Sequence, residues 1–193
     1  IIFFLIFKPK VNLKKNFKVQ IIRSTLMVTA TSFMFYSLQK FDLVDIYVVF
    51  FTAPLIVSLL SAYFLKDILT PKGIALMLLS FGSIVYSLGP SMKILSLDLI
   101  FPIVPPICWA LYQFFTKVVS GDNDPFAAIF YTSILGAIIF SIFIFFNWIP
   151  LEKNIYWLYL TLLGFAGFVS HSLIIYAIQL SNLSFVTNFQ YSQ

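Results

Sequence analysis

His171 is the residue in this sequence best suited to chemistry, because it is the only histidine and its ring can both donate and accept a proton. It lies well inside an apolar stretch that predicts a helix over residues 155–178. An ionisable group in apolar surroundings is costly unless it faces a polar interior or a water-filled cavity. We therefore expect His171 to belong to a binding site. The alternative is a neutral histidine that only hydrogen-bonds to a neighbouring helix.

Trp109, Tyr112 and Gln113 form a second group, spaced i, i+3 and i+4 along one predicted helix. Residues at that spacing share a helix face, so the two rings and the amide can point together into a cavity. Such a group suits the binding of a small molecule by stacking and hydrogen bonding. The alternative is that the rings only pack against neighbouring helices or face an apolar solvent.

Further neutral polar groups gather towards the end of the chain, at Asn188, Gln190 and Tyr191. Because amide and hydroxyl groups orient solutes well, we place these three side chains, together with Tyr36 and Tyr176, among the candidate substrate-binding residues. The alternative role for the amides is to join helices, since such hydrogen bonds contribute roughly 0.6 to 2 kcal/mol each in apolar surroundings.

Pro54, Pro105 and Pro106 lie inside apolar stretches, where proline removes a backbone donor and bends or breaks a helix. We predict that these positions serve as gates, although prolines also occur in apolar helices without such a role. Pro71 and Pro125 differ from them, because each follows a polar turn and fits the start of a new helix.

The acidic residues fall at the ends of the apolar stretches, so no carboxylate is expected midway along any of them. The sequence also lacks HExxH, GxSxG and a phosphate-binding loop. Its single cysteine, Cys108, can form neither an intrachain disulfide nor a metal cluster. We therefore predict no catalytic residue, no metal site, no cofactor and no enzymatic activity.

The composition indicates which solvent surrounds these groups. Of 193 residues, 61% are apolar and only 10% are charged, against roughly 25% charged in an ordinary soluble domain. So few charges cannot cover a water-exposed surface, and the continuous apolar runs indicate helices that cross a bilayer. We predict an all-α, multi-pass integral membrane bundle, with complete spans at 19–39, 45–65, 72–89, 97–117, 125–146 and 155–178 and partial spans at 1–7 and from 184.

The positions of lysine and arginine predict the orientation. Nine of the 12 lie on the side of segment 8–18, which places that segment in the cytoplasm and the protein in the inner membrane. The net charge of +5 is therefore a topology signal, and no nucleic-acid partner is expected. Arg23 is expected to snorkel to the interface from the first turn of its helix. Both ends of the chain fall inside apolar stretches, so we expect a truncation at each.

An internal repeat relates residues 32–52 to residues 172–192, with Tyr36 matching Tyr176 and Leu43 matching Leu183. In the predicted topology the chain crosses the membrane five times between the two copies, so the copies run in opposite directions. Inverted repeats are the architecture of many secondary transporters, which bind their solutes near the bilayer midplane. The alternative is a duplication of helices without transport.

Three stretches resemble EamA-type members of the drug/metabolite transporter superfamily. The family's third to fifth helices are similar to FYSLQKFDLVDIYVVFFTAPLIVSLLSAYFLKDILTPKGIALMLLSFGSIVYSLGP. Its sixth and seventh helices are similar to ICWALYQFFTKVVSGDNDPFAAIFYTS, and its eighth helix, running into the ninth, to GFVSHSLIIYAIQLSNLSFVTNFQYSQ. Two departures occur, since Lys66 stands where the family often has glycine and Asp67 where it usually has glutamate.

The resemblance implies a ten-helix parent built from two inverted five-helix repeats. Residues 1–89 then cover the end of helix two to helix five, and residues 90–193 cover helix six to the start of helix nine. It also implies a secondary carrier that moves a small organic metabolite by alternating access, in an oligomeric state left open. The alternatives are an intramembrane enzyme acting on lipid or isoprenoid and a structural membrane subunit that transports nothing.

Overall fold

The computed structural model describes residues 13–67, 70–88, 100–121, 125–148, 150–151 and 153–192. No strand occurs within these ranges, which agrees with the predicted all-α class. The elements in chain order are α2 (Phe17–Ser37), α3 (Leu43–Phe50), α4 (Ala53–Phe64), α5 (Pro71–Leu88), α6 (Ile100–Val118), α7 (Pro125–Phe146), α8 (Asn154–Leu180), α9 (Leu183–Asn188) and the 3-10 helix η2 (Phe189–Ser192).

The helices follow the predicted spans closely, because each long apolar run is bounded by polar turn residues. Pro71 and Pro125 are the first residues of α5 and α7, as predicted. Among the described residues, three helical stretches are long and apolar enough to cross a membrane, namely Leu43–Phe64, Pro125–Phe146 and Asn154–Leu180. The predicted partial span at 1–7 and the predicted repeat boundary at 89–90 lie outside the described residues.

One predicted span is divided in the structure. The sequence predicts a single helix over 45–65, whereas α3 and α4 are separated by a turn at Phe51 and Thr52. Pro54 accounts for the division, because it is the second residue of α4 and lacks the N–H that would bond to the carbonyl of Phe50. At the start of a helix that missing donor costs little.

The bundle buries polar as well as apolar side chains, and it leaves many large apolar side chains exposed. On α2, Gln20, Arg23 and Ser24 are buried, whereas Phe17 and Phe35 are exposed. Much of the surface of α7 and α8 consists of exposed large apolar side chains. The apolar exterior differs from that of a water-soluble bundle and is the one expected of a protein surrounded by lipid.

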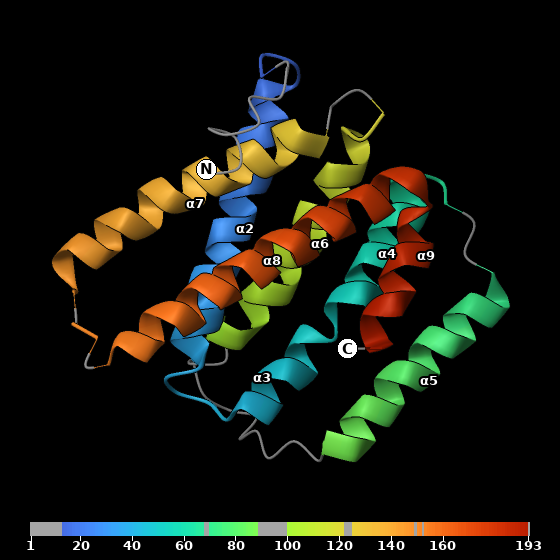
Figure 1. The fold of residues 1–193 in the computed structure, drawn as a ribbon. Coiled ribbons are helices and arrows are strands. Elements are labelled where there is room, and N and C mark those ends of the chain that lie inside the picture. The colour runs from blue at the N-terminus through green and yellow to red at the C-terminus, as the bar shows by residue number, and fades with distance from the viewer. Residues whose placement is uncertain are drawn as a thin grey trace.

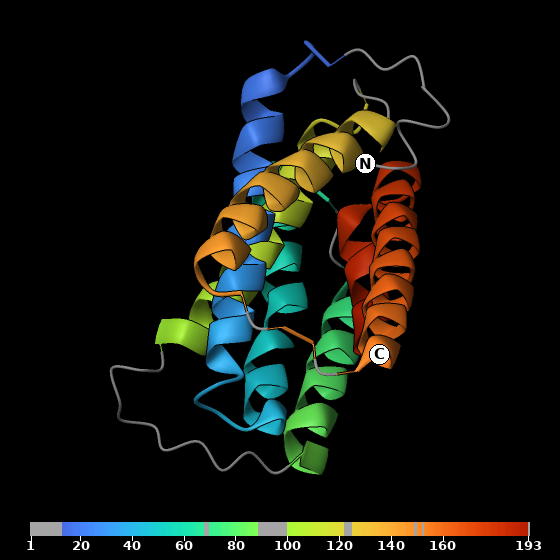
Figure 2. The ribbon, with the colours of Figure 1, turned by 60° about the vertical axis from the view of Figure 1, so that its left-hand side comes forward.

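The helices pack around α2, α4 and α6, with α5 at one edge (Figure 1). α2 packs against α6 and α7, and α4 packs against α6 and α9. A buried cluster of Val57, Ala110, Ile178 and Leu183 joins α4, α6, α8 and α9. Figures 1 and 2 both show α2 and α8 running in opposite directions, as the predicted topology requires.

The two copies of the predicted repeat have the same local geometry where their second helices begin. Asp42 precedes α3 with φ −65° and ψ 143°, and Asn182 precedes α9 with φ −62° and ψ 138°. Leu43 and Leu183, which match in the repeat, are the first residues of these two helices. The chain therefore makes the same turn into a helix twice.

Candidate functional site

A cavity of about 380 Å³ lies between α2, α3, α6 and α8. This volume falls within the range of small-molecule sites, which is roughly 300 to 1,000 Å³. No acidic side chain is among the described residues that line it. The lining residues are Met27, Ala30, Thr31, Met34, Phe35, Tyr47, Phe50, Trp109, Gly167, Ser170, His171 and Ile174.

Three of the predicted site residues meet at one wall of this cavity. The ring of Tyr112 stacks against those of Trp109 and His171, with centroid separations of 5.5 Å and 5.4 Å, and the centroids of Trp109 and His171 are 6.3 Å apart. Tyr112 Oη and His171 Nε2 are 2.6 Å apart and hydrogen-bonded. Trp109 and His171 line the cavity, whereas Tyr112 is fully buried behind them. The stack therefore joins α6 to α8 and presents an indole and an imidazole to the cavity.

Gln113 and Gln190 form a reciprocal amide pair between α6 and η2. Gln190 Nε2 donates to Gln113 Oε1 at 2.9 Å, and Gln113 Nε2 donates to Gln190 Oε1 at 3.4 Å. Both side chains are buried. The pair therefore joins α6 to η2, which is the alternative that the sequence left open for Gln190.

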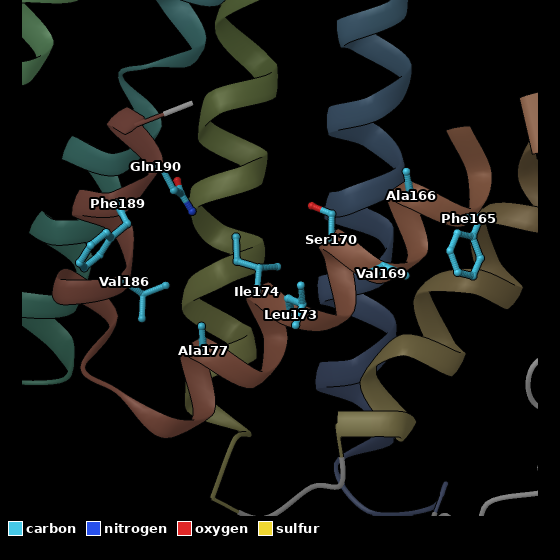
Figure 3. A pocket seen from close by; sticks show the side chains of 10 residues that line it. All are labelled: Phe165, Ala166, Val169, Ser170, Leu173, Ile174, Ala177, Val186, Phe189 and Gln190. Carbon is cyan, nitrogen blue, oxygen red and sulfur yellow. The ribbon is translucent and has the colours of Figure 1, made fainter. Parts of the chain in front are cut away.

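Gln190 also lines a groove of about 610 Å³ between α8 and α9, which Figure 3 shows. Its side chain is directed towards α6, as the amide pair requires. Ser170 and Ile174 line both this groove and the cavity. The rest of the groove is apolar, with Phe165 and Leu173 among its walls. The groove is therefore an apolar space that shares residues of α8 with the cavity.

Tyr191 lies beside the turn that separates α3 from α4. Its hydroxyl donates to the backbone carbonyl of Phe51 at 3.2 Å, and the two rings are 6.1 Å apart. These residues are separated by 140 positions, which is the offset of the predicted repeat. The two copies of the repeat therefore touch each other at equivalent positions.

Pro105 and Pro106 are buried within α6, which remains helical from Ile100 to Val118. Neither proline has a backbone N–H, so two hydrogen bonds of the first half of this helix are missing. Their role in gating stays a prediction, as does that of Pro54 at the start of α4.

Tyr36 and Tyr176 are not brought to the cavity. Tyr36 lies 4.5 Å from the ring of Phe101 between centroids and is 40% exposed. Tyr176 meets the ring of Phe126 edge-on at 6.5 Å and is 38% exposed. The two tyrosines do not line the cavity with His171, and their role as substrate contacts stays a prediction.

Asn188 lines a different, smaller pocket of about 200 Å³ formed by α4, α5 and α9. Asp67 lines the same pocket and accepts hydrogen bonds from Ser61 Oγ and, at 3.5 Å, from Ser184 Oγ. Asn188 Oδ1 is buried there without a hydrogen-bond partner. Asn188 is therefore separate from the aromatic wall with which the sequence grouped it.

Lys66 precedes Asp67 with a φ of 57°, in the left-handed region that favours glycine. This conformation would suit glycine, which is the residue that the resemblance led us to expect at this position. The departure at Lys66 leaves the backbone turn in place, so Asp67 still reaches its serine partners.

The structure corrects the expectation for Arg23, which does not snorkel to the interface. Arg23 lies in the second turn of α2, and its side chain is fully buried. Its Nη1 donates to Thr116 Oγ1 at 2.8 Å, and its Nη2 donates to the Ala128 carbonyl at 2.5 Å and to Thr132 Oγ1 at 2.8 Å. The guanidinium carbon lies 4.9 Å from the ring centroid of Tyr112. Arg23 thus joins α2, α6 and α7 directly behind the aromatic wall.

Sequence spacing on α2 carries a signal for this burial. Gln20, Arg23 and Ser24 are spaced i, i+3 and i+4, so they occupy one face of the helix, and all three are buried. A polar face on an otherwise apolar helix turns towards the protein interior when the surroundings are lipid. The expectation that Arg23 reaches the interface was wrong because it used only the distance of Arg23 from the helix end and not this polar face.

A helical bundle with a largely apolar exterior, buried polar side chains and a cavity the size of a small molecule defines the class of multi-pass helical membrane proteins. Within that class the chain belongs to the EamA-like transporter family, whose model matches residues 1–89 and 97–193. The resemblance predicted from the sequence is therefore confirmed. Family membership indicates a membrane transporter of the drug/metabolite type, with the lipid bilayer and a small molecule as its partners.

The fold also resembles that of a solved structure whose title states only "Crystal structure of protein". The two share 17% sequence identity with a TM-score of 0.75, over 95% of this chain and 67% of that chain. At this identity the likeness shows the fold alone. No curated protein matches the sequence.

Proposed function

We propose that this chain is part of a secondary carrier that moves a small organic metabolite across the inner membrane by alternating access. The carrier is built from two inverted five-helix repeats, with residues 1–89 in the first and residues 90–193 in the second. Its solute binds in the cavity between α2, α3, α6 and α8, and segment 8–18 faces the cytoplasm.

The observation that carries this proposal is the composition of the cavity wall. α2 and α3 supply one part of the lining, including Thr31 and Tyr47, and α6 and α8 supply the other, including Trp109 and His171. In the proposed division these two parts belong to different repeats. A site at the boundary between repeats is exposed to alternate sides when one repeat rocks against the other.

The relation between the repeats is supported by three independent features. α2 and α8 run in opposite directions (Figures 1 and 2), and Asp42 and Asn182 have the same backbone conformation before equivalent helices. Phe51 and Tyr191, at equivalent positions, are in contact. Contact between equivalent residues is expected close to a pseudo-twofold axis, which is where an inverted-repeat carrier holds its solute.

The test is uptake into proteoliposomes that hold the full-length protein. The liposomes are offered a mixed metabolite extract, with and without ion gradients, and their contents are compared with those of empty liposomes by mass spectrometry. Selective accumulation or exchange of one solute class supports a carrier. Correctly folded protein that moves nothing under any gradient contradicts it and favours an enzyme or a structural subunit.

Once a solute is found, His171→Ala tests the position of the site. Removing the imidazole deletes both a wall of the cavity and the partner of Tyr112, so we expect kcat/KM to fall at least about tenfold. Ser172→Ala is the matched control, because the Ser172 hydroxyl bonds only to the carbonyl of Phe168 in its own helix. Wild-type kinetics for His171→Ala would place the site elsewhere.

A further inference from the structure

Arg23 carries a buried charge, and its hydrogen-bond partners among the described residues are all neutral. They are the hydroxyls of Thr116 and Thr132 and the carbonyl of Ala128. Its Nε is buried without a partner, and no ion pair involves Arg23 within the described ranges. Neutral oxygens solvate a guanidinium but do not cancel its charge, so its field extends into the surrounding low-dielectric interior.

Tyr112 lies between this charge and the cavity. The guanidinium carbon is 4.9 Å from the centre of the Tyr112 ring, and Tyr112 Oη is hydrogen-bonded to His171 Nε2 at 2.6 Å. When the tyrosine hydroxyl donates to Nε2, the neutral imidazole carries its proton on Nδ1 and can donate it to a bound solute. The positive charge of Arg23 and the Nδ1–H donor of His171 would then both favour an anionic group on the solute.

The described lining of the cavity carries no anionic group that would neutralise this field. Its described lining contains no carboxylate, and its polar groups include the hydroxyls of Thr31 and Ser170 beside His171. The remaining walls are aromatic and aliphatic, among them Phe50 and Trp109, whose rings are 6.1 Å apart. Such a lining suits a solute with one anionic group and an apolar or aromatic body.

We infer that the carrier recognises its solute by an anionic group, a carboxylate or a phosphate, held at the His171 wall in the field of Arg23. This inference rests on the proposed function and adds the chemical class of the solute to it. Arg23 acts through Tyr112 and His171 and is a positioning residue, since it does not line the cavity.

A purely structural role for Arg23, as a link between α2, α6 and α7, makes a different prediction. In that case removal of the charge lowers stability and the amount of active carrier, but affects charged and uncharged solutes equally. If the role is electrostatic, removal of the charge lowers the preference for the charged solute over the uncharged one. The ratio of the uptake rates of these two solutes therefore separates the roles, because a loss of active protein lowers both rates by the same factor.

The experiment uses the full-length protein in proteoliposomes and the metabolite extract as its first probe. The solute recovered from the extract is then offered together with its uncharged ester, which is the methyl ester of a carboxylate or the dimethyl ester of a phosphate and has the same body without the anionic charge. We expect wild-type carrier to prefer the anionic form at least about tenfold, from the interaction of a buried charge with an anion a few ångströms beyond Tyr112. We expect Arg23→Gln to lose most of that preference and Arg23→Lys, which keeps the charge, to retain most of it.

Lys18→Gln is the matched control, because Lys18 is an exposed cation on the same helix. It should leave the ratio unchanged. If no solute moves, the proposed function fails and the inference with it. If the carrier moves only solutes without an anionic group, or if Arg23→Gln keeps the wild-type ratio, the inference alone is overturned. If Arg23→Gln does not fold, the inference is tested on the wild-type carrier alone. Equal uptake rates for the anionic solute and its ester would then overturn it.

Discussion

The buried polar side chains of this protein are mostly satisfied in pairs that cross between helices. Tyr112 bonds to His171 between α6 and α8, and Gln113 bonds to Gln190 between α6 and η2. Lys117 donates to the carbonyls that end α8. In lipid an unpaired polar group is costly, so each pair fixes the relative position of two helices as well as satisfying its own atoms.

The amide pair is predicted to be coupled in stability. Replacing either Gln113 or Gln190 with leucine leaves the other amide buried without its partner, which should lower the free energy of unfolding by roughly 1 to 3 kcal/mol. The double variant should cost less than the sum of the two singles, by roughly 0.6 to 2 kcal/mol. The measurement is a double-mutant cycle from unfolding in mixed micelles. Strict additivity would show that the two amides are independent.

Lys66 is predicted to strain its turn. Its φ of 57° is unfavourable for a residue with a Cβ atom, so Lys66→Gly should raise the free energy of unfolding by up to about 1 kcal/mol. Lys72→Gly is the control, because Lys72 lies in the first turn of α5, where glycine should be destabilising. Paired thermal unfolding curves measure both. A loss of stability for Lys66→Gly would contradict the prediction.

At the scale of the elements, the turn between α3 and α4 is the feature most suited to movement. It divides a membrane span at Phe51 and Thr52, and it is held by the hydroxyl of Tyr191. Interruptions of this kind let the two halves of a span move separately, and transporter sites are commonly built beside them.

Pro54→Ala tests whether this turn works as a hinge. The substitution restores an N–H that can bond to the carbonyl of Phe50, so α3 and α4 can join. We expect stability to change by less than about 1 kcal/mol, because the donor lies in a first helical turn. Turnover should fall several-fold, as measured by solute exchange. Pro71→Ala, at the start of α5, is the control. Unchanged turnover in a joined helix would show that the turn is not a hinge.

For the whole molecule, the orientation in the membrane can be tested by labelling. The background is Cys108→Ser, which removes the single cysteine. Gly121→Cys lies between α6 and α7, on the side predicted to be cytoplasmic, and an added Cβ meets nothing within 4 Å. We expect an impermeant maleimide to label it only after cells are opened. Gln39→Cys, exposed in the link from α2 to α3, should be labelled in intact cells. The reverse pattern would invert the predicted topology.

Much of the fold was predictable because lipid imposes simple rules on a sequence. Continuous apolar runs predicted the helices, and Pro71 and Pro125 predicted two of their starts. The turn at Phe51 was not predicted, because neither it nor Thr52 has the composition of a turn and Pro54 was expected to bend a continuous helix. A proline shows that a bond is missing, but neighbouring contacts decide whether the helix bends or stops.

The candidate site was predicted in part. Groupings within one helix could be predicted from the sequence, whereas groupings of residues from different helices could not. Trp109 and Tyr112 share a helix face by spacing alone, which the structure bears out in their stacked rings. That His171 completes this stack depends on how α8 lies against α6, and no local pattern determines that. For the same reason Tyr36 and Asn188 were grouped with residues that they do not approach.

The sequence by itself determined the solvent, the helices and the family, because each of these depends on composition, on periodicity or on residue patterns along the chain. The tertiary structure decided the environment of each polar side chain. Arg23 is the clearest case, since its position near a helix end allows it to reach water, and only packing against α6 and α7 buries it. Burial is a property of all the neighbouring helices together, whereas sequence position is a property of one.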